Sequence, residues 1–137
     1  MQKKPRPLCQ CGCGRKVSRP TTRFYSNKCQ KDHEYKQYID RWKAGLETGL
    51  KGYNQISAYI RRYLLEKYGE KCFRCGWSER HPITGRVPVE VEHIDGNFRN
   101  TSEENLLLLC PNCHSLTPTY RALNSGSGRP SRRAGVA

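Results

Sequence analysis

The sequence predicts a small α+β protein whose folding depends on bound zinc. The chain has 137 residues, enough for one ordinary domain or two very small ones. Only 35% of its residues are hydrophobic, which is below the usual share of a globular chain, and yet it contains eight cysteines. Because a structural metal can replace buried apolar area as a source of folding energy, these two observations together favour zinc.

Charge and apolar patterning exclude two classes of protein. The longest apolar run, from Leu106 to Cys110, is far shorter than the roughly 18 residues of a membrane helix. Residues 1–7 are basic without an apolar stretch, so we expect no signal peptide and reduced cysteines. The net charge of +13 indicates a polyanionic partner. Nucleic acid is the first choice, although a membrane surface or a ribosome would also suit this charge.

Hydrophobic periodicity predicts two helices in the first part of the chain. Residues 31–44 should form a helix that ends near Gly45 and has one apolar face, composed of Tyr35, Tyr38, Ile39 and Trp42. Residues 57–68 should form the second helix, with Ser57 as its N-cap and Gly69 as its terminator.

Shorter elements are expected in the second half of the chain. Residues 87–93 alternate apolar and polar side chains, which predicts a strand, and residues 95–97 form a turn. Leu106 to Leu109 should be a short buried strand. Pro111 to Thr117 should be a helix, since proline is favoured in a first turn.

Two Cys-x2-Cys pairs predict one structural zinc site. The ligands would be Cys72, Cys75, Cys110 and Cys113, because each pair offers two thiolates from one tight turn. The segment between the pairs is longer than a minimal zinc ribbon requires. We therefore expect a further structural feature within that insert.

A second zinc site is expected near the N-terminus. Cys29 and His33 are four residues apart, so on a helix they face the same way. They need two further ligands, and the expected set is Cys9, Cys13, Cys29 and His33, with Cys11 as the alternative. The first 31 residues also contain nine Lys or Arg and no acid, which predicts that this module contacts the polyanion.

The insert between the cysteine pairs contains three residues of catalytic type, and a fourth follows the second pair directly. Glu92 and His93 stand at a strand end, Asn105 follows, and His114 comes directly after a zinc ligand. The four-cysteine site is complete without His114, so that side chain can face back toward His93. We expect Glu92, His93 and His114 in one small cleft, with Asp95 as the alternative carboxylate to Glu92.

These residues resemble the HNH endonuclease family. The segments Glu92–Asn97 and Asn105–His114 contain the family's His, Asn and His in their usual order and spacing, within its zinc-knuckle frame. The resemblance covers roughly residues 59–124. Residues 23–30 look like the small zinc module that precedes this domain in phage-encoded members, although Tyr25 stands where that module usually has cysteine.

The resemblance implies a ββα-metal fold that hydrolyses DNA phosphodiesters. His93 would be the general base, Asn105 would hold that base in register, and Glu92 and His114 would bind a catalytic divalent metal. Mg²⁺ is the expected ion, with Mn²⁺, Ni²⁺ and Zn²⁺ as alternatives because one ligand is an imidazole. One or two structural Zn²⁺ ions would accompany it.

The expected organisation has four parts. These are a basic zinc module with a helix (residues 1–45), a linker (46–56), an HNH nuclease domain (57–124) and a disordered basic tail (125–137). The expected partner is DNA and not a membrane. The expected setting is the cytoplasm of a bacterial host, and we expect the protein to be phage-encoded.

A non-catalytic zinc DNA-binding protein is the alternative function, but a protein that only binds DNA has no need for all four catalytic-type residues. An RNA-binding or ribosome-associated role is supported only by the positive net charge, since the sequence lacks the aromatic stacking motifs of RNA-binding domains.

Overall fold

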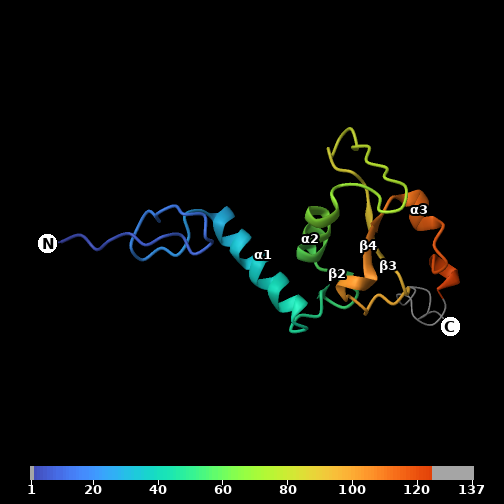
Figure 1. Ribbon diagram of the computed structural model, residues 1–137, viewed down its shortest axis with the longest axis horizontal. Helices are drawn as coiled ribbons and strands as arrows, with labels where there is room; N and C mark the ends of the chain where they lie inside the picture. The colour runs from blue at the N-terminus through green and yellow to red at the C-terminus, as the bar shows by residue number, and fades with distance from the viewer. Residues whose placement is uncertain (1, 125–137) are drawn as a thin grey trace.

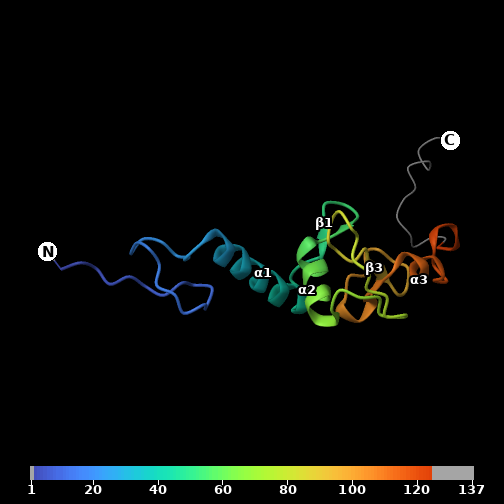
Figure 2. The ribbon, with the colours of Figure 1, turned by 90° about the horizontal axis from the view of Figure 1, so that it is seen from above.

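The computed structural model describes residues 2–124, so the expected tail at 125–137 lies outside the described residues. Figures 1 and 2 show the N-terminal segment projecting from one end of helix α1, away from the compact part of the molecule. Two small two-stranded sheets and three α-helices make this a small α+β fold, as the sequence predicts. Within residues 2–124, no helix has the length and apolarity needed to cross a membrane.

Helix α1 (Asn27–Lys43) begins earlier than expected because a side chain caps it. The Ser26 hydroxyl accepts a hydrogen bond from the Cys29 amide at 3.2 Å, so the first turn forms before Lys31. The predicted apolar face is confirmed, since the buried residues of the helix include Tyr35, Ile39 and Trp42.

Helix α2 (Ala58–Tyr68) is confirmed with both of its predicted boundaries. The Ser57 hydroxyl accepts from the Tyr59 amide, and Gly69 ends the helix with a φ of 80°. Ile60 and Leu64 have no exposed surface. They belong to a core between α1, α2 and the second sheet, whose buried residues are Tyr35, Ile39, Trp42, Ile60, Leu64, Val87, Val89, Leu106 and Leu108.

Part of the segment expected as a linker, residues 46–56, forms a β-hairpin. Strands β1 (Leu50–Lys51) and β2 (Gln55–Ile56) pair antiparallel. Gly49 precedes them with a φ of 73°, and a Cβ atom there would lie 2.6 Å from Ile60 Cδ1. This close packing holds the base of the hairpin against α2.

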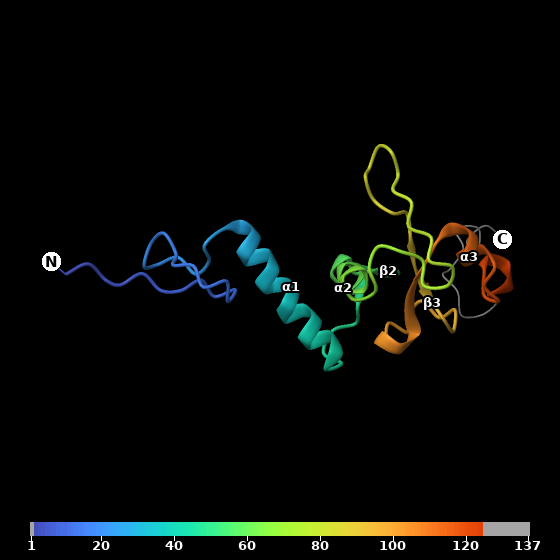
Figure 3. The ribbon, with the colours of Figure 1, turned by 45° about the horizontal axis from the view of Figure 1, so that its top comes forward.

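The second sheet is the scaffold of the C-terminal half. Strands β3 (Glu90–His93) and β4 (Leu106–Leu109) pair antiparallel, with Glu92 opposite Leu107. β3 is shorter than the predicted strand, because Pro88 has no N–H to donate to a ladder. The segment before β3, yellow-green in Figure 3, stands out from the rest of the domain.

Helix α3 (Pro111–Ser115) follows β4 directly and is shorter than the predicted 111–117. Its N-cap is Cys110, whose thiol accepts from the Cys113 amide at 3.4 Å. The order strand, strand, helix therefore places His114 on the first turns of a helix beside β3 and β4.

Candidate active site and metal centres

The structure brings together the four cysteines expected to bind the C-terminal zinc. The ligand atoms of Cys72, Cys75, Cys110 and Cys113 all lie within 4.8 Å of one another. The Sγ atoms of Cys75 and Cys110 are 3.7 Å apart, far beyond the roughly 2.05 Å of a disulfide, and all four thiols are free. This group can hold one metal ion, and four converging thiols are the donor set that structural zinc takes.

The ionisation of these thiols supports a bound cation. Burial alone raises the pKa of Cys72, but backbone N–H groups, that of Cys110 foremost, outweigh it and lower the pKa to about 6. Burial and the neighbouring thiols raise the pKa of Cys113 to about 12. Because four adjacent thiolates repel one another, full ionisation of the group needs a cation among them, and Zn²⁺ fits this need.

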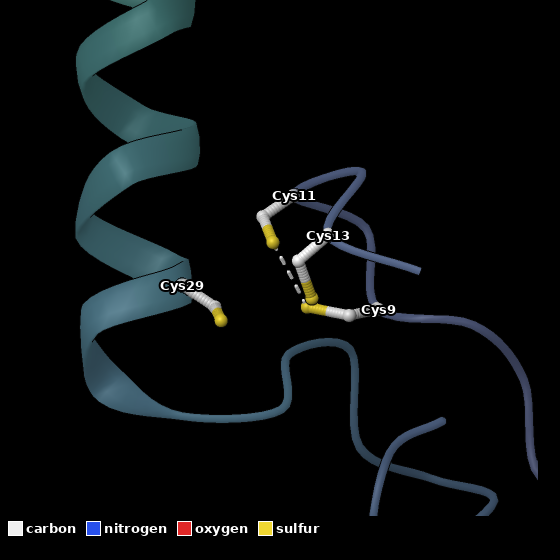
Figure 4. Close-up of side chains that lie close together, drawn as sticks. All are labelled: Cys9, Cys11, Cys13 and Cys29. Carbon is white, nitrogen blue, oxygen red and sulfur yellow. Dashed lines mark hydrogen bonds between the residues drawn. The ribbon is translucent and has the colours of Figure 1, made fainter. Parts of the chain in front are cut away.

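The N-terminal cysteines form a second group whose membership differs from the expected set. Figure 4 shows that their side chains converge from a loop and from the first turn of α1, and the group consists of Cys9, Cys11, Cys13 and Cys29. Cys11, the alternative ligand, lies in the group, with its Sγ 3.3 Å from that of Cys9. Gly12 and Gly14 have left-handed backbones, with φ of 86° and 79°, and provide the tight turns between these thiols.

His33 is not a member of this group. Its ring packs against Phe24, with 5.2 Å between the ring centroids. The loop of residues 9–13 therefore supplies three thiols and α1 supplies one, so the group reaches four ligands without an imidazole. This arrangement can also hold one metal ion.

One cleft lies between β3, α3 and the segment that follows α3. It has a volume of about 490 Å³, and its lining includes six ionisable side chains, namely Arg61, Glu90, Glu92, His93, His114 and Arg121. Three of the four residues of catalytic type thus line one cleft. Their catalytic roles remain predictions. Asp95, the alternative carboxylate, is not among the lining residues.

Within the cleft, a histidine lies between two carboxylates. Glu92 is 7% exposed, and its Oε2 lies 2.5 Å from Nδ1 of His114. Nε2 of His114 lies 3.4 Å from Oε2 of Glu90. Glu90 and Glu92 share one face of β3 because side chains alternate along a strand. Two carboxylates and an imidazole are a donor set that suits a divalent cation.

Asn105 lies behind the cleft and fixes the loop that follows His93. It is 8% exposed, and its Oδ1 accepts from the Asp95 amide at 3.0 Å. Its Nδ2 donates to Oδ1 of Asp95 at 2.9 Å and to the carbonyl of Asn100 at 2.8 Å. Hydrogen bonds from the Asn100 side chain and other groups of this loop hold the pKa of Asp95 below its usual range. The Asp95 carboxylate is therefore engaged within the loop.

Three ionisable residues of the cleft were not predicted from the sequence. Glu90 was recognisable in principle, because it stands two positions before Glu92 and so shares its strand face. Arg61 and Arg121 gave no such signal, since only the packing of α2 and of the segment after α3 brings them to the cleft.

Comparison with curated proteins supplies the family context. Over 97 residues, the chain is 38% identical to H-N-H endonuclease F-TflIV of Escherichia phage T5, and the match covers 66% of this chain and 40% of the relative. The chain is therefore similar, over much of its length, to a phage-type HNH endonuclease. The family resemblance of the sequence is thereby confirmed. The chain spans less than half the length of the phage protein that it matches. No family model and no solved structure matches the present chain.

Proposed function

We propose that the chain is a metal-dependent DNA endonuclease with a ββα-metal core made of β3, β4 and α3. The observation that carries the proposal is the cleft, where Glu92, His93 and His114 meet beside a loop fixed by buried Asn105. The similarity to a phage H-N-H endonuclease supports the reaction class. The net charge of +13 suits a DNA substrate. A phage-encoded protein of this kind would act in the cytoplasm of the bacterial host.

His93 is the proposed general base. It stands at the end of β3 and lines the cleft, where it can take the proton of an attacking water. Histidine suits this role because its unperturbed pKa lies nearest neutral pH. A positioned base contributes a factor of about 10²–10⁴ in rate. Asn105 fixes the loop that directly follows the base. In this way it would also fix the direction in which His93 faces the cleft.

Glu92 and His114 would hold the catalytic divalent cation, and Glu90 adds a third donor beside them. When bound, such a cation stabilises negative charge on the leaving 3′ oxygen. Mg²⁺ is the proposed ion, since two of the three donors are carboxylates, and Mn²⁺ and Ni²⁺ tolerate the imidazole. The burial of Glu92 and the position of His114 on a short helix keep these two donors in register.

The two cysteine groups are proposed as structural zinc sites. The C-terminal group joins the segment before β3 to the start of α3, so its zinc would hold His114 opposite Glu92. The N-terminal group, with Cys11 in the place expected for His33, would fold a basic module that contacts the phosphate backbone.

The test is cleavage of supercoiled plasmid in the presence of Mg²⁺, Mn²⁺ or Ni²⁺. We expect the wild-type protein to cut. His93→Ala should be at least about 100-fold slower at every metal concentration, because the base is lost. His114→Ala should regain part of its rate at high metal, since it lacks only a ligand. His81→Ala is the matched control, because His81 lies on the exposed segment before β3, outside the cleft lining.

Each outcome separates two possibilities. Cleavage by His93→Ala at the wild-type rate would exclude this residue as the base. A wild-type protein that binds DNA but cuts it with none of the three metals would favour the alternative function, a non-catalytic zinc DNA-binding protein.

A further inference from the structure

Two arginines flank the cleft from different elements. Arg61 comes from α2 and Arg121 from the segment after α3, and both line the cleft together with His93 and His114. The next residue of α2 behaves differently, because Arg62 forms ion pairs with Asp32 and Glu66, at 3.0 and 2.9 Å, outside the cleft lining. Two neighbouring arginines of one helix therefore have separate environments.

The guanidinium of Arg61 is held in place by the backbone at the start of the sheet. Its Nη2 donates to the carbonyl of Val89 at 2.8 Å, directly before Glu90. A guanidinium has five N–H donors in a planar fork, so one bond to a carbonyl orients the group while the fork can still face an anion. Arg61 is half-buried, which limits the other directions that its side chain can take.

Arg121 reaches the cleft through a strained backbone. Its φ of 47° makes it the one non-glycine residue with positive φ among residues 2–124. Such strain persists only where the surroundings impose it, and it is concentrated at functional sites. The surroundings are visible here, since the Tyr120 ring packs edge-on against His114 with 5.3 Å between centroids. The guanidinium of Arg121 lies 5.1 Å from the centroid of the Tyr120 ring.

Close packing also ties this segment to the loop that follows His93. The Asn124 side chain donates to the carbonyl of Gly96 at 2.6 Å, and a Cβ atom on Gly96 would lie 2.8 Å from Cβ of Thr119. The wall that contains Arg121 is thus fixed to the same loop that Asn105 holds. Arg121 and the base are therefore positioned by one connected set of contacts.

The charges of the cleft indicate what the two arginines bind. The negative charges of Glu90 and Glu92 would be balanced by the divalent cation proposed to bind there. The guanidinium groups of Arg61 and Arg121 leave positive charge in the cleft for a further anion and match the geometry of phosphate oxygens. We propose that Arg61 and Arg121 form a clamp that grips the scissile phosphate from two sides and orients it toward His93. This inference rests on the proposed function and adds the residues that would position its substrate.

The first experiment tests the clamp without any cleavage. The zinc-loaded full chain, in Mg²⁺, is titrated with dimethyl phosphate while the Nε–Hε signals of its arginines are followed by NMR, with assignments from single Arg→Lys variants. We expect the signals of Arg61 and Arg121 to shift together and to saturate, while that of Arg62 stays in place. Signals of Arg61 and Arg121 that move no more than that of Arg62 would overturn the clamp.

The second experiment tests what the clamp does to the reaction. At saturating DNA, single-turnover cleavage by Arg61→Ala and by Arg121→Ala should be slower by about 100-fold, the usual loss when one preorganised donor is removed. Arg61→Lys should recover part of the rate, because it restores the charge without the fork. Arg62→Ala should stay within about threefold of wild type, and Mn²⁺ affinity, measured by electron paramagnetic resonance, should be unchanged in all variants.

Failure of the clamp and failure of the proposed function give different results. If the wild-type protein cleaves DNA and both alanine variants cleave at its rate, the clamp is wrong and the nuclease stands. If the wild-type protein does not cleave, the nuclease is wrong, and the phosphate titration still decides whether Arg61 and Arg121 bind a phosphodiester. Zinc content and circular dichroism show whether each variant has kept its fold.

Discussion

Replacing one cysteine in each group should separate the roles of the two proposed zinc sites. Cys113→Ser removes a buried thiol on α3, next to His114, and Cys29→Ser removes the thiol that α1 contributes to the N-terminal group. A structural zinc contributes about 10–16 kcal/mol of folding free energy in zinc-finger peptides. Whole domains are stable by only about 5–15 kcal/mol. The folding free energy lost with the C-terminal zinc should therefore exceed the stability of the sheet that it supports. We expect this part of the fold to unfold in Cys113→Ser.

The N-terminal replacement should have a local effect. The buried residues around that group are Cys9, Val17 and Cys29, which form a cluster separate from the main core. We therefore expect Cys29→Ser to disorder the basic module while the remaining domain keeps its cooperative melting.

Zinc content and tryptophan fluorescence are the assays. The full chain should bind two zinc ions per molecule and each variant one. Trp77 packs against the C-terminal cysteines and Trp42 lies in the main core, so both should report unfolding in Cys113→Ser and neither in Cys29→Ser. A Cys113→Ser protein that keeps two zinc ions, or that melts at the wild-type temperature, would refute the reasoning that zinc supports this half of the fold.

Four further changes to the protein should each alter DNA affinity, metal binding, stability or cleavage rate in a defined direction. Deleting residues 1–25 removes seven Lys or Arg, so DNA affinity in a binding titration should fall and its dependence on salt should become shallower, by about one unit of log–log slope for each phosphate that is no longer neutralised. Glu90→Gln removes one carboxylate donor and should weaken Mn²⁺ binding, followed by electron paramagnetic resonance, by about tenfold. Gly49→Ala combines a strained φ with a Cβ clash of 2.6 Å, so its unfolding free energy in denaturant should fall by about 2–4 kcal/mol. Asn105→Asp puts a second carboxylate where the amide now donates to Asp95, so single-turnover cleavage should slow and thermal stability should drop at pH 7, and unchanged values would contradict the positioning role.

The features that could be predicted from sequence depend on residues close together in the chain. Helix α2 has its cap and its terminator within one short segment, at Ser57 and Gly69, so both boundaries were predictable. Each Cys-x2-Cys pair likewise defines half of a metal site by local geometry alone. Strand β4 is a run of four leucines, which indicates burial whatever the rest of the fold.

The features that could not be predicted depend on distant contacts. The hairpin at residues 50–56 is anchored by the Thr101 hydroxyl, which donates to the Thr48 carbonyl across a large sequence separation. The N-terminal group contains Cys11 and not His33 because the loop of residues 9–13 folds back on α1. Arg61 enters the cleft only because α2 packs against β4 of the second sheet and the Arg61 guanidinium meets the Val89 carbonyl. Local patterns contain no information about such contacts.

The C-terminal cysteine group and the cleft depend on the same two segments. The Phe73 amide, next to Cys72, donates to the carbonyl of Leu108 at 2.8 Å and so joins the first knuckle to β4. The second knuckle ends on α3, where Cys113 and His114 are adjacent. A zinc ion shared by the two knuckles would therefore fix the distance between the sheet and His114. We therefore expect that a cation bound by Glu92 and His114 would not replace the proposed structural zinc, because the cysteine group joins α3 to the sheet and so positions the imidazole.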